Sequence, residues 1–350
     1  MKPVVGLFFG GASPEYKVSL ASAAAVLRHL SRARYDCRAV GITRGGRWFL
    51  TEASPDEIEG DRWQNAPCTP AALSPDPGRP GLLLFPAEGQ AARLHLDVLF
   101  PVTHGTYGED GRLQGLFALS GTPFVGCDTQ ASAVCMDKAL TKTLLRAEGV
   151  PVLPSLLLHR ADVARPAEVI CRVENEIGFP AFVKPARSGS SVGAGRADNT
   201  PTLLTSLVHA AGVDDRILVE PCVRAREVEV AILETGGTLT VSHPGEIRPH
   251  AEFYDYDTKY TAGRATLCDH ADISPACADT VRALAEKIFR LLELRGMARV
   301  DFFVTDDEHI YCNEINTLPG FTAGSMYPRL LSGEDGFAGL LDRLIAGARR

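Results

Sequence analysis

The chain has 350 residues, of which 45% are hydrophobic and 23% are charged, and its net charge is −7. This length predicts two or three domains, and the acidic balance disfavours nucleic acid or an anionic membrane as a partner. No apolar run reaches the roughly 18 residues of a membrane-spanning helix. The nine cysteines are scattered without a C-x-x-C pair, which indicates reduced thiols in a cytoplasmic protein and disfavours a zinc site.

The N-terminal part of the chain alternates between strand-like and helix-like segments. Residues 3–9 and 96–102 predict buried strands, and a helix with Ser13 as its cap would follow the first of them. Residues 52–90 are rich in proline, glycine and acids, and predict an insertion of loops around one short hydrophobic stretch. The alternation predicts a parallel α/β domain that ends near residue 127.

The sequence changes character from residue 150 onward. Short segments with β-branched residues and turn signals predict a more antiparallel α+β region, with helices at 137–148 and 275–294. Within this region, Lys184 ends an apolar strand and leads into the Gly-Ser segment RSGSSVG. Free backbone amides bind phosphate oxygens well and an ammonium adds charge, so this segment predicts either a phosphate-covering flap or a mobile surface loop. It is not a P-loop, and no dinucleotide fingerprint opens the chain.

Two further positions suggest nucleotide binding, although each has an ordinary explanation. Lys138 lies at an element boundary, and Glu220 lies near the end of the strand-like segment ILVEPCV. Glu220 could accept a hydrogen bond from an adenine amino group. Lysines and acids at such places are more often solvated, so both interpretations stay open at this point.

Residues 297–316 predict a hairpin that brings polar side chains together. If the turn occupies 305–308, residue 301 faces 312 and residue 299 faces 314. Because strand side chains alternate, four polar residues would share one face: Arg299, Asp301, Glu314 and Asn316. Two carboxylates and an amide oxygen suit Mg²⁺. A hairpin with one solvated polar face is the alternative.

Seven segments, in chain order, resemble the D-alanine–D-alanine ligases of the ATP-grasp superfamily. They are GGASPEYKVSLASA, HGTYGEDGRLQG, CMDKALTK, VKPARSGSSVG, FYDYDTKY, ARVDFF and NEINTLPGFTAGSMYP. The resemblance implies an α/β and α+β protein with the three-domain ATP-grasp fold. Its expected parts are an N-terminal α/β domain (1–127), a central ATP-grasp subdomain (128–223) and a C-terminal ATP-grasp subdomain (224–350).

The resemblance also implies a two-step reaction in a cytoplasmic enzyme of peptidoglycan precursor synthesis. The carboxylate of a first D-alanine attacks the γ-phosphate of ATP, which gives an acyl phosphate and ADP. The amine of a second D-alanine then attacks the acyl carbon, and phosphate leaves. The implied cofactors are ATP and two Mg²⁺ (or Mn²⁺), and family members are commonly homodimers.

The resemblance assigns roles to individual residues of this sequence. The nucleotide would be held by Lys138, Lys184, Glu220, Val223, Glu227 and Lys259, and the metals by Asp301, Glu314 and Asn316. The substrates would be bound and activated by Glu15, Ser190, Tyr260, His104, Arg299, the Gly320 N–H, Ser325 and Met326. Glu15 would receive the first ammonium as part of a triad with Ser190 and Tyr260, and Arg299 with Gly320 would stabilise the tetrahedral oxyanion. As alternatives, Glu15 could simply favour a helix N-terminus, and His104 could be a satisfied core histidine.

The second substrate is the main point that the sequence leaves open. Tyr260 and Met326 resemble the D-alanyl-D-alanine enzymes, because the lactate ligases lack this tyrosine and the resistance-type enzymes tend to have arginine at the second position. Tyr16, in contrast, occurs in a serine-type resistance ligase. A D-alanyl-D-serine or D-alanyl-D-lactate ligase is therefore the alternative. A regulatory module that only binds ATP, or another ATP-grasp ligase, would not need the full set of site residues.

Overall fold

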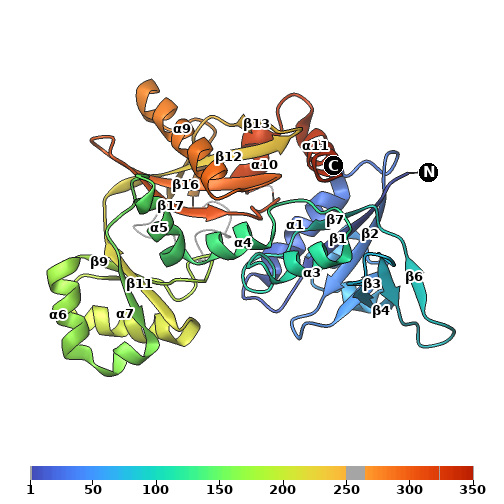
Figure 1. Cartoon of the computed structure of the whole chain (residues 1–350), viewed down its shortest axis with the longest axis horizontal. Coiled ribbons are helices and arrows are strands. Elements are labelled where there is room, and N and C mark those ends of the chain that lie inside the picture. The colour runs from blue at the N-terminus through green and yellow to red at the C-terminus, as the bar shows by residue number, and fades with distance from the viewer. Residues whose placement is uncertain (1, 250–264, 323, 350) are drawn as a thin grey trace.

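The computed structural model describes residues 2–249, 265–322 and 324–349, so the predicted site residues Lys259 and Tyr260 lie outside it. Three β-sheets follow one another along the chain (Figure 1). The blue N-terminal sheet lies at one end of the molecule, and the green and yellow central sheet lies at the other. The orange C-terminal sheet lies between and above them. None of the described helices has the length and apolarity needed to cross a membrane.

The N-terminal sheet has a parallel centre, as predicted. β1 (Val4–Gly10) pairs in parallel with β2 (Asp36–Ile42) and with β7 (Val98–Pro101). The helix that follows β1, α1 (Tyr16–His29), begins later than expected, with Glu15 rather than Ser13 at its cap position. The Ser13 hydroxyl instead accepts from the Glu15 N–H at 3.1 Å, which fixes the backbone of Glu15 just before the helix.

The prediction of loops over residues 52–90 was wrong in part, because a helix and two short strands form within this range. The helix is α2 (Pro55–Glu59), and the strands are β4 (Cys68–Leu73) and β5 (Leu82–Leu84), of which β5 is the expected hydrophobic stretch. Together with β3 (Trp48–Thr51) and β6 (Ala92–Leu94) on either side of the range, these strands extend the sheet in antiparallel order. Strands of three to six residues are too short to show alternation among so many turn residues. In the same segment, Trp63 is fully buried and its indole N–H donates to the Tyr16 hydroxyl at 2.9 Å.

The central sheet is antiparallel, as expected for the region after residue 150. Its strands, in spatial order, are β10 (Gly195–Ala197), β9 (Ala181–Pro185), β11 (Arg216–Pro221) and β8 (Leu156–His159). Apolar side chains of α6 (Pro166–Glu176) and α7 (Thr200–Val213) pack with those of the sheet in one core. Before the sheet come α3 (Arg112–Ser120), α4 (Thr129–Met136) and α5 (Lys138–Ala147).

The C-terminal sheet is also antiparallel and carries the predicted hairpin. Its strands are β15 (Ala265–Cys268), β14 (Gly245–Pro249), β12 (Ala225–Thr235), β16 (Met297–Thr305) and β17 (Ile310–Asn316), and β13 (Thr238–Val241) pairs with β12. The helix α9 (Pro275–Leu291) shares its core. The last helices, α10 (Met326–Leu331) and α11 (Gly336–Ala348), reach back to α1 and share the N-terminal core with it.

The hairpin register differs from the predicted one by two residues. Beside the turn, Val304 pairs with Ile310 and not with residue 309, and a register shift between Asp301 and Phe302 then leaves Asn313 as an extra residue. Asp301 consequently pairs with Glu314, and Arg299 pairs with Asn316. The four polar side chains keep a common face because the two single-residue shifts add up to an even number. The residues expected in the core, Phe302 and Ile315, are buried.

Candidate active site

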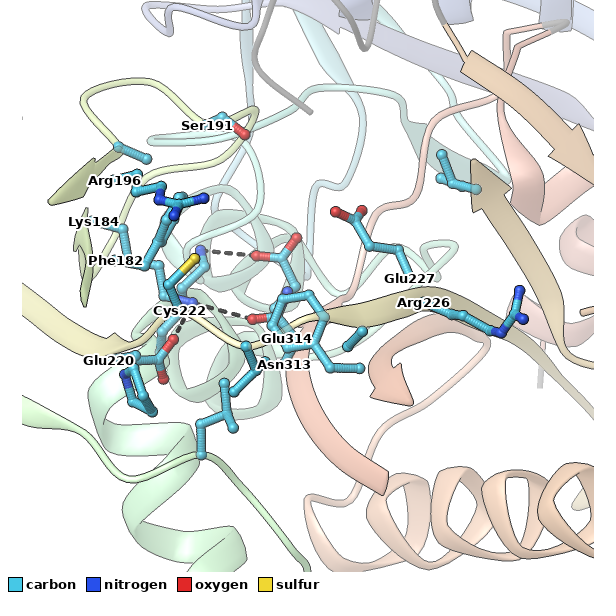
Figure 2. A pocket seen from close by; sticks show the side chains of 18 of the residues that line it. Phe182, Lys184, Ser191, Arg196, Glu220, Cys222, Arg226, Glu227, Asn313 and Glu314 are labelled. Atoms are coloured by element: carbon cyan, nitrogen blue, oxygen red, sulfur yellow. Dashed lines mark hydrogen bonds and ion pairs between the residues drawn. The ribbon is translucent and has the colours of Figure 1, made fainter. Parts of the chain in front are cut away.

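A cavity of about 990 Å³ lies between the central and C-terminal sheets. Six of the predicted site residues line it along with the flap: Lys138, Lys184, Glu220, Val223, Glu227 and Glu314. Figure 2 shows the side chains of Lys184, Glu220, Asn313 and Glu314 gathered together, with Glu227 facing them from β12. The volume and the mixed charges suit a nucleotide.

The two predicted phosphate-binding lysines come from different elements and point into this cavity. Lys138, the first residue of α5, donates to the Ser188 carbonyl oxygen at 2.8 Å and lies 3.1 Å from Glu314 Oε2. Burial opposes its charge, but Glu314, together with Glu15 and Glu109, holds the Lys138 pKa above its usual value. Lys184, on β9, lies 2.7 Å from Glu220 Oε2 and donates to Asn313 Oδ1 at 3.1 Å. Both ammonium groups are thus fixed before any phosphate arrives.

Glu220 occupies a more interior place than the sequence suggests. It is 2% exposed, and its carboxylate lies between two ammonium groups, with Lys142 Nζ 2.7 Å from Oε1 and Lys184 Nζ 2.7 Å from Oε2. Burial disfavours the ionised form of Glu220, but Lys184 and Lys142 hold the Glu220 pKa below its usual value. The carboxylate therefore stays ionised and forms ion pairs with the two lysines. Its predicted contact with adenine stays a prediction.

The Gly-Ser segment closes onto the N-terminal domain. The Ser190 hydroxyl donates to Glu15 Oε1, so the structure brings together two members of the predicted triad. Ser190 and Ser191 both have left-handed backbones, with φ of 50° and 57°, which is a strained conformation for residues other than glycine. A β-carbon at Gly189 would lie 2.6 Å from Glu15 Oε2, so only glycine lets the segment approach this carboxylate so closely.

The polar face of the hairpin holds a guanidinium between two carboxylates, on a side chain that is 17% exposed. Arg299 donates to both oxygens of Asp301 at 2.8 Å, and its Nε lies 3.0 Å from Glu229 Oε2. Burial opposes the charge, but Asp301 and Glu229 hold the Arg299 pKa well above its usual value. Asn316 Nδ2 donates to Asp301 Oδ2 at 2.9 Å. This arrangement fixes the fork of Arg299, which is the geometry that an anion-binding group needs.

The donor set of the hairpin fits Mg²⁺ when phosphate is also present. Asp301 and Glu314 lie directly opposite each other, and Asn316 adds an amide oxygen beside them. Over the described ranges there is no group of three or more His, Cys, Asp or Glu residues that could hold a metal. Two carboxylates and an amide complete an octahedral shell only with water and phosphate oxygens, which is how Mg²⁺ is usually bound beside nucleotides.

The loop that carries Gly320 is held by two buried side chains of the N-terminal domain. His104 Nδ1 donates to the Leu318 carbonyl oxygen at 3.0 Å, and the Ser22 hydroxyl lies 3.2 Å from His104 Nε2. Ser22 Oγ also accepts from the Phe321 N–H at 3.2 Å. These contacts fix the backbone on both sides of Gly320. They make His104 a satisfied core histidine, and its predicted contact with a substrate carboxylate stays a prediction.

The two residues predicted beside the second substrate follow this loop. Ser325 Oγ accepts from the Thr322 N–H at 3.1 Å and would lie 2.7 Å from a β-carbon at Gly320. Met326 begins α10 and is buried, with its thioether close to Gly245. Tyr16, the residue that favours a serine-type ligase, is buried against Trp63 in the N-terminal core.

The structure adds four residues that sequence reasoning missed: Lys142, Glu229, Asn313 and Glu109. Two had a periodic signal, because Lys142 follows Lys138 by one helical turn and Glu229 follows Glu227 by two positions of a strand. Asn313 enters the site through the bulge, which the sequence does not reveal. Glu109 lies beside Lys138 and Glu314, and burial, reinforced by Glu15, raises its pKa well above the usual value.

The buried His104 should make folding stability sensitive to acid. Burial lowers its pKa from 6.5 to about 4, so below pH 6.5 the unfolded chain binds a proton that the folded chain excludes. Stability should be complete above pH 6.5 and fall by about 3 kcal/mol as the pH drops to 4. Urea unfolding across this range should show that His104→Gln loses this part of the dependence, whereas the exposed His209→Gln keeps it. An equal acid dependence in His104→Gln and the parent chain would contradict this assignment.

Comparisons with known proteins place the whole chain in one family. The model of the D-Ala–D-Ala ligase N-terminus matches residues 4–127, and that of the C-terminus matches residues 144–346. The D-alanine–D-alanine ligase of Caldicellulosiruptor bescii is 39% identical over 98% of this chain and 94% of its own length. That of Mycobacterium tuberculosis is 43% identical over 93% and 90%.

Solved structures agree with these matches in fold. The VanG D-Ala:D-Ser ligase from Enterococcus faecalis has a TM-score of 0.88 and 33% identity over the whole of both chains. The D-alanine–D-alanine ligase from Coxiella burnetii has a TM-score of 0.85 and 34% identity over 99% of this chain and 94% of that one. The predicted ATP-grasp architecture is confirmed, and the chain belongs to the D-alanine–D-alanine ligase family.

Proposed function

We propose that this protein joins two D-alanine molecules, with consumption of ATP, to give D-alanyl-D-alanine for peptidoglycan precursors. The proposal rests above all on one observation. The phosphate-binding lysines, the acidic hairpin and the Glu15–Ser190 pair all adjoin the flap at one edge of the cavity. A module that only binds nucleotide has no use for a carboxylate aimed at an amino-acid ammonium beside the phosphates.

In the first step, the chain would hold the reacting groups in line and neutralise their charge, as phosphoryl transfer requires. Lys138 and Lys184 would bind phosphate oxygens, and the resemblance adds Lys259, which lies outside the described residues. Val223, Glu220 and Glu227 would bind the adenosine. Glu15 would receive the ammonium of the first D-alanine, so that its carboxylate faces the γ-phosphate.

Asp301, Glu314 and Asn316 would hold the magnesium ions. Bound there, Mg²⁺ would neutralise the charge that develops on the phosphate oxygens. Lys138 Nζ lies 3.1 Å from Glu314 Oε2, so this lysine stands beside the residues that would hold the metal and could share a phosphate with them.

In the second step, the amine of the second D-alanine attacks the acyl carbon and phosphate leaves. Arg299 and the Gly320 N–H would stabilise the negative oxygen of the tetrahedral intermediate, because both are fixed in advance by their neighbours. Ser325 and Met326 would border the second substrate. Tyr260 and Ser190 would complete the triad with Glu15.

The D-alanyl-D-serine ligase is the second candidate, favoured by the likeness to VanG and by Tyr16. Two observations weigh against it. The Tyr16 side chain is committed to Trp63, and Met326 stands where the resistance-type enzymes tend to have arginine. We further propose a cytoplasmic homodimer that binds neither nucleic acid nor membrane, with the domain boundaries 1–127, 128–223 and 224–350.

The test is phosphate release from ATP and Mg²⁺ with D-alanine alone, and then with D-serine or D-lactate added, with products identified by mass. D-alanine alone should give the dipeptide, with no mixed product near neutral pH. Preferential formation of a mixed product would move the enzyme to the resistance-type group. ATP binding without turnover on any of these substrates would reject the ligase.

A further inference from the structure

A buried lysine outside the cavity wall is the most unusual charge in the described structure. Lys142 is 1% exposed, lies one helical turn after Lys138 on α5, and is not among the residues that line the cavity. A lysine is almost never fully buried unless it is paired, since desolvation of its ammonium is costly. Its place in the fold therefore needs a reason other than packing.

Lys142 is the end of a chain of charges that leads to the nucleotide cavity. Its Nζ lies 2.7 Å from Glu220 Oε1 and 3.5 Å from the Cys312 carbonyl oxygen. The other oxygen of Glu220 lies 2.7 Å from Lys184 Nζ, which in turn donates to Asn313 Oδ1 at 3.1 Å. The chain runs from α5 through β11 and β9 to the bulge of β17.

We propose that Lys142 is a positioning residue for ATP. It pairs with Glu220 on the side away from the cavity, and it thereby sets the position and charge of Lys184. This inference rests on the assignment of the cavity to ATP in the proposed function. With Lys142 present, Glu220 divides its charge between two ammonium groups, so Lys184 is aimed but not fully neutralised. Without Lys142, the carboxylate would turn wholly to Lys184 and compete with phosphate for it.

The electrostatic surroundings of Lys184 give this role a distinct signature. The charged groups that face it are Glu220 from β11 and both Lys142 and Lys138 from α5, beside the uncharged Asn313 of β17. Burial lowers the Lys184 pKa, the two lysines lower it further, and Glu220 opposes them. Loss of the positive charge at Lys142 should therefore raise the Lys184 pKa, even as it weakens phosphate binding.

The experiment is calorimetric binding of the Mg²⁺ complex of a non-hydrolysable ATP analogue between pH 7 and 10. Lys142→Met should bind about tenfold more weakly at pH 7.5, as expected when Lys184 loses one charge-assisted contact with phosphate. As the pH rises, the affinity of Lys142→Met should begin to fall at a higher pH than that of the parent chain, because Lys184 keeps its proton longer. Lys142→Arg should restore most of the affinity, and Lys287→Met, which removes an exposed lysine of α9, should change nothing.

Two results would overturn the proposed role of Lys142, and a third would overturn the proposed function on which it rests. Unchanged affinity and pH dependence in Lys142→Met, with only a lower melting temperature, would make Lys142 a packing residue. If Lys142→Met does not fold, Glu220→Gln tests the same link, because it should move the alkaline loss to lower pH, and no movement would reject the chain of charges. Failure of the parent chain to bind the analogue would instead reject the proposed function.

Discussion

Replacement of Arg299 by methionine should lower kcat by about 10²–10³-fold, the usual effect of removing one oxyanion donor. The guanidinium is fixed by Asp301 and Glu229, so its position does not depend on substrate. The effect should fall mainly on the second chemical step. Trapping with hydroxylamine separates the steps, because an acyl phosphate that accumulates is captured as the hydroxamate. Arg299→Met should still form hydroxamate while it makes little dipeptide.

The control for this variant is Arg299→Lys, which keeps a positive charge but not the planar fork. It should retain more activity than Arg299→Met, yet less than the parent chain, because a single ammonium cannot satisfy both carboxylates in the same geometry. ATP affinity should stay within a few-fold of the parent in both variants, as evidence that they fold. A kcat within fivefold of the parent in Arg299→Met would rule out the oxyanion role.

Replacement of Glu314 by glutamine should lower kcat by about 10³-fold and move the Mg²⁺ dependence to higher concentration. A metal ion in phosphoryl transfer contributes several kcal/mol, and each 1.4 kcal/mol corresponds to a tenfold change in rate. Glu314 is the carboxylate that lies directly across the hairpin from Asp301 and 3.1 Å from Lys138. The amide keeps the shape of the side chain but removes the charge that pairs with Lys138 and that would bind the metal.

The matched control is Asp306→Asn, an exposed carboxylate in the turn of the same hairpin. It should leave both kcat and the Mg²⁺ titration unchanged. Activity measured over a wide range of Mg²⁺ and Mn²⁺ concentrations distinguishes weaker metal binding from a lost chemical step. Equal Mg²⁺ dependence in Glu314→Gln and the parent chain would show that the metals bind elsewhere.

The sequence predicts the face of the hairpin but not its register. Period-two alternation puts Arg299 and Asp301 on one side of their strand, and Glu314 and Asn316 on one side of theirs. The two pairs share a face because the observed register differs from the predicted one by two residues, whereas a shift by one residue would have separated them. The bulge at Asn313 was not predicted, because the turn alone does not reveal an extra residue further along the strand. That bulge is also what brings the amide of Asn313 to Lys184.

Residues with recognisable local patterns were easier to place than those with long-range partners. Lys184 and the flap carry a local signature, and the structure puts them at the cavity as expected. The contact between Ser190 and Glu15 joins residues 175 positions apart, and no local pattern specifies it. Here the resemblance to known ligases supplied what periodicity could not. Trp63 had neither kind of signal, since its partner Tyr16 belongs to another motif.

The arrangement of the apolar cores has a consequence for how the molecule opens. Side chains of α1, α11 and the C-terminal sheet belong to one continuous core, whereas the central sheet and its helices have a core of their own. The N-terminal and C-terminal domains should therefore behave as a single cooperative unit. The central sheet with α6 and α7 can swing as a rigid body without exposing either core, so admission of nucleotide and escape of product need break only polar contacts across the cavity and the small apolar cluster of Ala139, Ala186 and Leu218.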